Sequence, residues 1–119
     1  MTRTFINFTN HPSSLWDETQ RQAAEAFGTI IDLPFPAVTP DLSEQEIIIL
    51  GDTFLKNILS YNPVAVLCQG EFTLAFYVAS QLKKQGISVL AACSERNTVT
   101  VGNEKRSIFT FVQFREYVI

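Results

Sequence analysis

The sequence predicts an α/β domain built on a parallel sheet, and three observations support this prediction. Short apolar runs, typical of strands that are buried on both faces, occur at residues 64–68 and 87–93. Longer segments with apolar residues at helical spacing separate such runs. The 119 residues, 46% hydrophobic and 18% charged, suit one domain with a single core. We therefore expect one domain over residues 1–119.

Up to residue 40 the expected order is strand, helix, strand and loop: TFINF (4–8), about 15–27, TIIDL (29–33) and PFPAVTP (34–40). Ser14 is the expected N-cap of the helix, and Gly28 is its expected end. Three prolines in seven residues exclude both helix and central strand from the loop.

The chain continues as helix, strand, helix and strand: Ser43 to about Tyr61, VAVLC (64–68), EFTLAFYVASQLKKQ (71–85) and ISVLAAC (87–93). Ser43 and Glu46 fit a capping box, and Gly86 fits the C′ position of the third helix. NTVTV (97–101) and RSIFTFVQF (106–114) predict a half-buried antiparallel hairpin. The whole order predicts a small Rossmann-like domain, with helices on both faces of a parallel sheet and a C-terminal antiparallel hairpin.

Charge and hydropathy exclude several classes of partner. The net charge of −3 argues against binding of long DNA or RNA through a basic face. The charge is uneven, −5 over residues 1–67 and +2 over residues 68–119, so a small anionic ligand is compatible with the sequence. No apolar run approaches the ~18–20 residues of a membrane span. The N-terminus carries no signal-peptide pattern, so we expect a cytoplasmic protein without membrane contact.

The two cysteines, Cys68 and Cys93, lie at the ends of apolar runs, and the chain has one histidine. Because CxxC spacing is absent and there is one histidine, we do not expect a zinc site or another metal. No cofactor is expected. Without an export signal, a disulfide is not expected either. Both cysteines should therefore be buried and unbridged.

Polar clusters follow three of the predicted strands: TNHPSS (9–14), QGEFT (69–73) and SERN (94–97). In an open parallel sheet, ligands bind beyond the C-terminal ends of the strands, and right-handed crossovers bring those ends to one edge. The three clusters together predict a ligand site there. GxGxxG and Walker patterns are absent, so no motif supports a dinucleotide or an NTP.

Four residues of these clusters each have two interpretations. Gly70 either lets backbone N–H groups close on a phosphate or forms a tight turn. Glu71 either is stabilised by the helix dipole or accepts a ribose hydroxyl. His11 either exchanges a proton near neutral pH or caps a turn. Arg96 either clamps a phosphate or pairs with a neighbouring glutamate. Hydrogen bonds of no special specificity are expected from the other polar side chains: Thr9, Asn10 and Thr73.

Four stretches carry a family resemblance: NFTNHPS, CQGEFTLAFYVASQLKKQG, AACSERNTV and KRSIFTFVQFREY. They resemble the small stand-alone CRISPR-associated proteins of type III systems that have a CARF-like (CRISPR-associated Rossmann) fold. The similarity is to a ring-nuclease-like group with a Q-G-[DE]-F turn after one strand and Ser/Thr-x-Arg after the next. The C-terminal pattern F-x-x-V-x-F-R-x-Y completes it, and the resemblance covers nearly the whole chain.

The resemblance implies a homodimer that binds a cyclic oligoadenylate across its two-fold axis and, in several branches, cuts it. The implied ligand face comprises Thr9, Asn10, His11, Gln69, Gly70, Glu71, Thr73, Ser94 and Arg96. Cleavage would need no metal: a ribose 2′-OH attacks the adjacent phosphate, and either His11 transfers the proton or pre-organisation of the attack alone suffices. Arg96 and the amides near Gly70 would stabilise the phosphoryl oxygens.

The chain departs from a basic ligand face, because Arg96 is the one clear cation in the expected loops. Lys105 and Arg106 could add charge if the hairpin folds over, and two subunits could pool theirs. Two other functions fit the same residues. A sensor or sponge would bind the ring without cutting it, and an unrelated small α/β domain would bind no nucleotide.

Overall fold

A five-stranded sheet forms the centre of the computed structural model, which describes residues 3–119. The strands are β1 (Thr4–Phe8), β2 (Thr29–Asp32), β3 (Ala65–Cys68), β4 (Ser88–Val101) and β5 (Glu104–Glu116). Their order in the sheet is β2-β1-β3-β4-β5. The first four strands are parallel, and β5 pairs antiparallel with β4. The predicted mixed α/β architecture with a C-terminal antiparallel pair is therefore confirmed.

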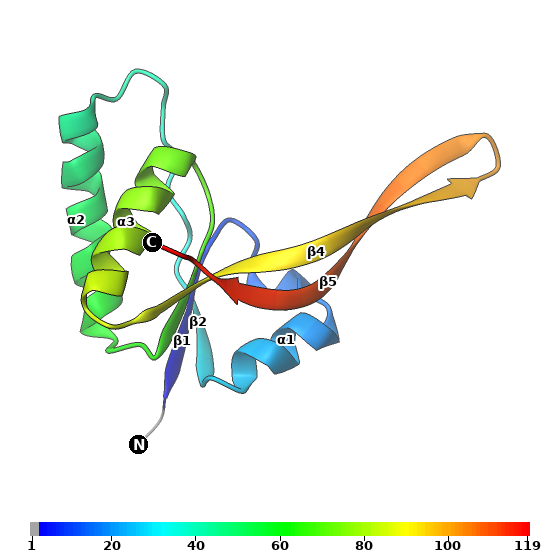
Figure 1. Ribbon diagram of the computed structural model, residues 1–119. Helices are drawn as coiled ribbons and strands as arrows, with labels where there is room; N and C mark the ends of the chain where they lie inside the picture. Colours follow the sequence, from blue (N-terminus) through cyan, green and yellow to red (C-terminus); the bar gives the residue numbers. More distant parts are fainter. Residues whose placement is uncertain (1–2) are drawn as a thin grey trace.

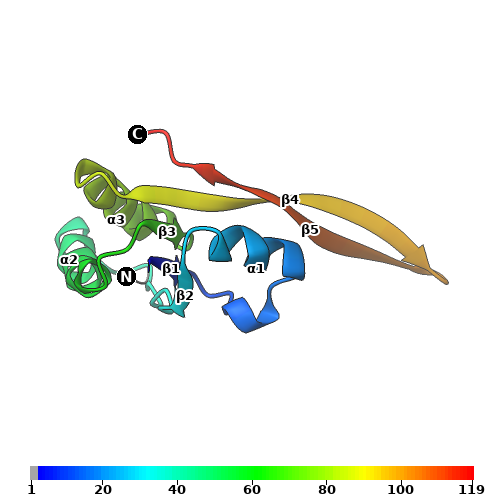
Figure 2. The same ribbon diagram turned by 90° about the horizontal axis from the view of Figure 1, so that it is seen from below.

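The helices cover the two faces of this sheet. They are the short 3-10 helix η1 (Ser13–Leu15), α1 (Glu18–Glu25), α2 (Glu44–Ser60) and α3 (Phe72–Lys84). Helices α2 and α3 pack together on one face, and α1 lies on the other (Figure 1, Figure 2). No helix within residues 3–119 combines the length and the apolar character needed to traverse a bilayer.

The apolar core has one part on each face, because side chains alternate along the central strands. Ile6 and Phe8 of β1 point into the part under α2 and α3. Phe5 points to the α1 face, where it packs with Trp16 and Phe114. All four residues of β3 are buried, as the continuous apolar run predicts. Burial of a Val, Leu, Ile or Phe side chain in this core contributes about 1.5–3 kcal/mol.

Two expected helix signals are confirmed. Ser43 and Glu46 form the capping box of α2: the Ser43 hydroxyl accepts from the Glu46 amide at 3.1 Å, and the Glu46 carboxylate accepts from the Ser43 amide at 3.2 Å. Gly86 follows α3 with φ of 79°, the left-handed conformation that glycine adopts most easily.

The helix expected over 15–27 is shorter than predicted and has another cap. Asp17, not Ser14, caps α1, and its carboxylate accepts a hydrogen bond from the Gln20 amide at 2.8 Å. Trp16 lies before the helix in extended conformation, because burial of its ring in the core outweighs its place in the helical pattern. The helix ends at Glu25, before Gly28.

The expected loop at 94–97 is wrong, because β4 continues through it to Val101. β5 pairs with β4 along its length, from Leu90 opposite Glu116 to Val101 opposite Glu104. The register shifts between Cys93 and Ser94, where β5 carries an extra residue. The two predicted strands at 87–93 and 97–101 are thus one 14-residue strand.

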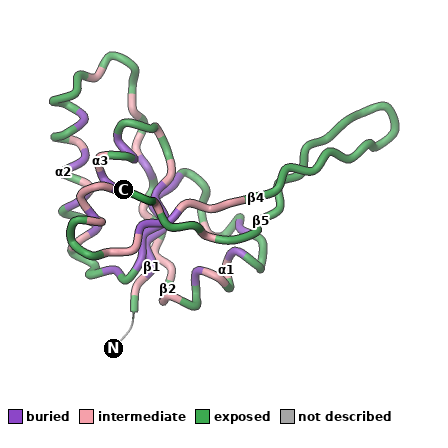
Figure 3. Tube along the Cα trace, in the orientation of Figure 1, coloured by how far each residue is buried: buried purple, intermediate pink, exposed green. Residues whose placement is uncertain are grey.

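We call residues 95–110 the ribbon. It projects from the body of the protein and is exposed over its length (Figure 1, Figure 3). The radius of gyration is 15.7 Å, against about 13.5 Å for a compact chain of this length. The hairpin is therefore half-buried only near its base, where Phe111 and Phe114 pack against the α1 face.

The two cysteines differ in burial. Cys68 is fully buried, as expected, whereas Cys93 is only half-buried, because it lies where β4 leaves the body of the sheet. Both are free thiols.

Candidate functional site

The strand order places a crevice at the C-terminal ends of β1 and β3. From β1 the chain passes to β2 on one side, and from β3 it passes to β4 on the other. The loops that leave these two neighbouring strands therefore diverge, which is where open α/β sheets bind their ligands.

A cavity of about 540 Å³ lies at this edge of the sheet, and we call it the α1-face cavity. Its walls come from the β1–α1 loop, the start of α1 and the strands β3, β4 and β5: Thr9, His11, Leu15, Asp17, Gln20, Leu67, Gln69, Ala92, Ser94, Phe109 and Phe111. The volume is within the roughly 300–1,000 Å³ of small-molecule sites. Four of the nine predicted site residues line it: Thr9, His11, Gln69 and Ser94.

A buried amide holds the β1–α1 loop on one side of this cavity. Asn7 is 1% exposed, and its Nδ2 donates to the carbonyl of His11 at 3.0 Å and to Asp32 Oδ1 at 2.8 Å. The Thr9 hydroxyl donates to Asn7 Oδ1 at 2.8 Å, and the Trp16 indole donates to the His11 carbonyl at 3.0 Å. The loop is thus fixed, and the Thr9 hydroxyl proton is used internally.

Asp32 extends this network to the start of η1. Its carboxylate accepts from the Ser13 amide at 3.2 Å and from the Ser13 hydroxyl at 2.9 Å. The backbone of His11 is held by these contacts, while its imidazole is exposed at the cavity wall. Asn10 is exposed in the same loop. Sequence reasoning missed Asn7 and Asp32, because a polar residue inside a strand reads as an interruption of the apolar pattern.

Gln69 bridges the two strands that form the floor of the cavity. Its Oε1 accepts a hydrogen bond from the Ala92 amide at 2.5 Å, just beyond the last paired residues of β3 and β4. This contact fixes the orientation of the amide. The Nε2 group, a donor, makes no hydrogen bond with residues 3–119 and is left for a ligand.

Gln20 is a buried polar residue of the cavity wall that the site prediction did not include. It is 8% exposed, it lines the α1-face cavity, and its side-chain amide has no hydrogen-bond partner within the described chain. Its signal in the sequence is a glutamine on the same face of α1 as the buried Ala24, four residues later. Phe109, 66% exposed, and Phe111 add aromatic surface from β5.

The N-terminus of α3 is already capped by an anion. The Glu71 carboxylate accepts hydrogen bonds from the Thr73 hydroxyl and from the amides of Thr73 and Leu74. The bond from the Thr73 hydroxyl is the main reason that the pKa of Glu71 lies below its ordinary value. A phosphate at this helix end would have to displace a carboxylate.

Gly70 is needed for a reason that the sequence did not reveal. A Cβ at this position would lie 2.4 Å from Cδ1 and Cε1 of Phe35. The Phe35 ring is buried and packs on Phe8 at a centroid distance of 4.8 Å. The absence of a side chain at Gly70 therefore leaves the space that the Phe35 ring occupies in the core.

A second cavity, of about 680 Å³, lies on the other face of the sheet against α3. Gly70 and Thr73 line it together with Gln69 and Tyr117, and its walls are mainly apolar. Gln69 thus contributes to both cavities, whereas Gly70 and Thr73 line only this one. The predicted site residues that line neither cavity are Asn10, Glu71 and Arg96.

Arg96 lies on the ribbon, two residues beyond Ser94. Its Nε and Nη2 donate to the Ser107 hydroxyl at 3.1 Å, so it pairs with neither Glu71 nor Glu95. Side chains two residues apart on a strand point to the same face, about 7 Å apart. Arg96 therefore lies on the same face of β4 as Ser94, but it does not line the α1-face cavity, and its guanidinium reaches outward to Ser107, which pairs with Thr98 farther along the ribbon.

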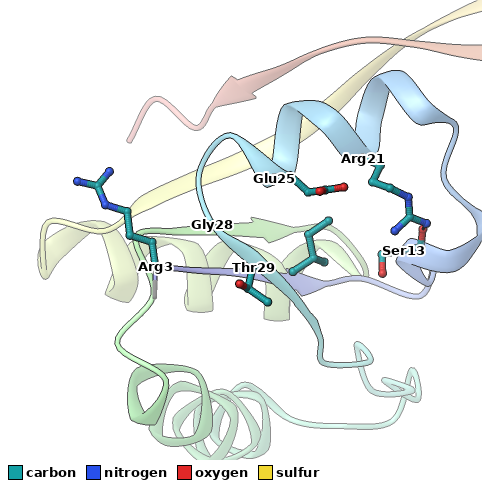
Figure 4. A pocket seen from close by; sticks show the side chains of 7 residues that line it. Arg3, Ser13, Arg21, Glu25, Gly28 and Thr29 are labelled. Carbon is teal, nitrogen blue, oxygen red and sulfur yellow. Dashed lines mark hydrogen bonds between the residues drawn. The ribbon is translucent and has the colours of Figure 1, made fainter. Parts of the chain in front are cut away.

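A third cavity, of about 520 Å³, lies beside the edge strand β2 (Figure 4). Two cations line it, but they do not converge. Arg21 Nη2 donates to the Ser13 carbonyl at 2.7 Å, and Arg3 points away from Arg21 (Figure 4). No group of three potential metal ligands occurs among the residues that the structure describes.

Comparison with known proteins identifies a family. The family model described as "Uncharacterized protein MJ1673 family" matches residues 3–115. No curated protein and no solved structure matches the chain.

Proposed function

The chain belongs to the MJ1673 family, and we propose that it is a CARF-like, Rossmann-type cytoplasmic protein that binds a cyclic oligoadenylate in the α1-face cavity and cleaves it as a ring nuclease. One observation carries this proposal: a cavity at the β1/β3 crevice combines side-chain amides with aromatic surface, and Arg96 lies two residues beyond its wall on the same face of β4. Aromatic faces stack on bases, amides recognise base edges, and guanidinium groups bind phosphates.

The arrangement of charge favours one orientation of such a ligand. The cavity wall carries the acidic Asp17 and no lysine or arginine. Arg96 stands outside it, and the α3 N-terminus is occupied by Glu71. A base would therefore enter the cavity, and the phosphate would lie toward Arg96 rather than at the Gly70 amides.

The proposed cleavage is a transesterification within the ligand. The ribose 2′-oxygen forms a bond to the adjacent phosphorus while the bond from phosphorus to the 5′-oxygen breaks. The products are a 2′,3′-cyclic phosphate and a 5′-hydroxyl. His11 would take the proton of the 2′-OH and return one to the leaving oxygen. Arg96 would stabilise the charge on the phosphoryl oxygens.

A homodimer is part of this proposal, and the ribbon supports it. Apolar side chains on the ribbon are exposed, on the face away from the cavity: Val99, Val101 and Ile108. We take this apolar surface as the candidate contact between two copies. The ribbon carries a net charge of +1 and the rest of the chain −4, so a second copy is also an electrostatically suitable partner. Two ribbons would pool Arg96, Lys105 and Arg106 of both chains.

Chromatography of cyclic oligoadenylates incubated with pure protein tests the function. We expect linear products ending in a 2′,3′-cyclic phosphate. Arg96→Ala should fold normally and reduce binding or turnover at least about tenfold, because a charge-assisted hydrogen bond is worth about 1.5–3 kcal/mol. Arg115→Ala, an exposed arginine on the opposite face of the same strand pair, is the matched control. His11→Ala should slow turnover more than binding.

The other functions give different results in the same experiment. Tight binding without linear products would identify a sensor or sponge. Absence of binding to any cyclic or linear oligoadenylate would refute the proposal and leave a small α/β domain without a nucleotide ligand.

A further inference from the structure

We infer that Gln20 reads the edge of an adenine base that lies against Phe109 in the α1-face cavity. The inference rests on the proposed function, because adenine is taken from the proposed ligand. It adds the residue that would distinguish adenine from other bases.

The first observation is the state of the Gln20 side chain. It is more than nine-tenths buried, and its amide has no hydrogen-bond partner among residues 3–119. The amide atoms themselves remain open to the cavity, since the one buried side-chain polar atom without a partner within residues 3–119 is Ser80 Oγ. The first turn of α1 holds Gln20 in place, because the backbone N–H of Gln20 donates a hydrogen bond to the Asp17 carboxylate that caps the helix. A ligand in the cavity would supply the missing partner.

The second observation is the chemistry of the walls around it. A carboxamide offers one acceptor and two donors, and it pairs with adenine through N6–H and N7. Guanine presents acceptors at both of these positions, so one of the two hydrogen bonds would be lost. The wall contains no lysine or arginine and one carboxylate, which suits a neutral base better than a phosphate.

The third observation is the support from the neighbouring residues. Gln69 also lines this cavity, and its Nε2 donor, which makes no hydrogen bond within residues 3–119, suits a ring nitrogen or a ribose oxygen. The Phe109 ring is two-thirds exposed on the wall, where it is accessible for stacking. A cavity of about 540 Å³ is large enough for one nucleoside.

The test uses Gln20→Met, which keeps the length of the side chain and removes the amide. Gln22→Met, an exposed position of the same helix, is the matched control. Binding is measured by calorimetry with the cyclic oligoadenylate that the wild type binds best and with its inosine analogue, in which an acceptor replaces N6–H2. The wild type should prefer the adenine ring by about 10- to 100-fold. Gln20→Met should lose about 10- to 100-fold in affinity for the adenine ring and lose the preference, whereas Gln22→Met should change neither.

The melting temperature of the ligand-free variant and the binding of a smaller ligand separate the possible outcomes. Without ligand, Gln20→Met should melt close to the wild-type temperature, because the substitution removes no hydrogen bond within residues 3–119 and the amide atoms it replaces are open to solvent. A much lower melting temperature, or unchanged preference for adenine, overturns the inference and leaves the proposed function intact. If no oligoadenylate binds, adenosine monophosphate is added and the Gln20 side-chain amide is followed by NMR. A shift specific to adenine supports the base pocket without the proposed function, and no shift overturns both.

Discussion

Gly70→Ala should destabilise the fold by displacing Phe35. The glycine does not have a positive φ, so the backbone conformation itself accepts alanine. The new Cβ would lie 2.4 Å from two carbons of the ring and 2.6 Å from a third. Unstrained carbon contacts are about 3.5–4.0 Å, so the ring has to retreat by more than about 1 Å.

The two opposing contributions can be compared. Overpacking of a buried site costs about 1–3 kcal/mol. Alanine also reduces the conformational freedom of the unfolded chain, which stabilises the fold by about 0.4–1 kcal/mol. We therefore expect a net loss of about 1–2 kcal/mol in the free energy of unfolding, measured by urea denaturation. For a chain of this size, the melting temperature should fall by about 3–5 °C for each kcal/mol.

A double-mutant cycle assigns this loss to the ring. Phe35→Val removes the atoms that the new Cβ would meet, at its own cost in buried surface. In that background Gly70→Ala should be neutral or slightly stabilising, so the two substitutions should not be additive. An equal loss of stability in both backgrounds would show that Phe35 is not the reason for the glycine.

Four further predictions concern burial and assembly. Burial raises the pKa of Cys68 from 9.0 to about 12. The native Cys68 thiol should therefore resist thiol reagents at pH 8, while the half-buried Cys93 reacts. Equal labelling rates of the two cysteines would contradict this prediction. The same shift stabilises the fold below pH 9, and urea titrations should show this contribution being lost as pH rises from 9 toward 12. Asn7→Ala should cost about 1–3 kcal/mol of stability, because it leaves its buried partners unpaired, and a loss within error of zero would exclude the network as a determinant of the loop. Light scattering of the wild type should give twice the chain mass of 13.4 kDa. Val99→Asp should lower the measured mass toward that of one chain, whereas the control Ile49→Asp, at an exposed apolar position of α2, should not change it. A wild-type monomer at micromolar concentration would count against the homodimer.

Local patterns were sufficient to predict most of the strands and helices. The apolar run at 64–68 and the capping box at Ser43 depend on neighbouring residues, and both are confirmed. The start of α1 was not predicted, because Ser14 and Asp17 are both good N-caps and the burial of Trp16 decides between them. That choice depends on tertiary contacts with Phe5 and Phe114, which are distant in the sequence.

The candidate site could be predicted only in part. Loops at the ends of β1 and β3 were predicted from topology, and they contribute His11 and Gln69 to the cavity. Gln20 was not predicted, since a glutamine on a helix is more often exposed. Glu71 was predicted to lie at a helix N-terminus. Whether its own carboxylate caps that helix depends on the geometry of the side chain.

The irregular spacing of apolar residues in β5 accounts for the part of the cavity wall that was not predicted from the sequence. Along a regular strand, residues an odd number of positions apart point to opposite faces, so Phe111 and Phe114 would diverge. The structure instead pairs Phe114 with Ala92 and Phe111 with Ser94, whose side chains share the α1 face. The extra residue of β5 opposite Cys93 and Ser94 makes this possible, and the two rings meet at a centroid distance of 4.9 Å. Beyond this bulge, regular alternation resumes and brings Phe109 and Arg96 to the cavity side. One additional residue in β5 therefore sets which side chains the ribbon presents to a ligand and which apolar side chains it presents to a second copy.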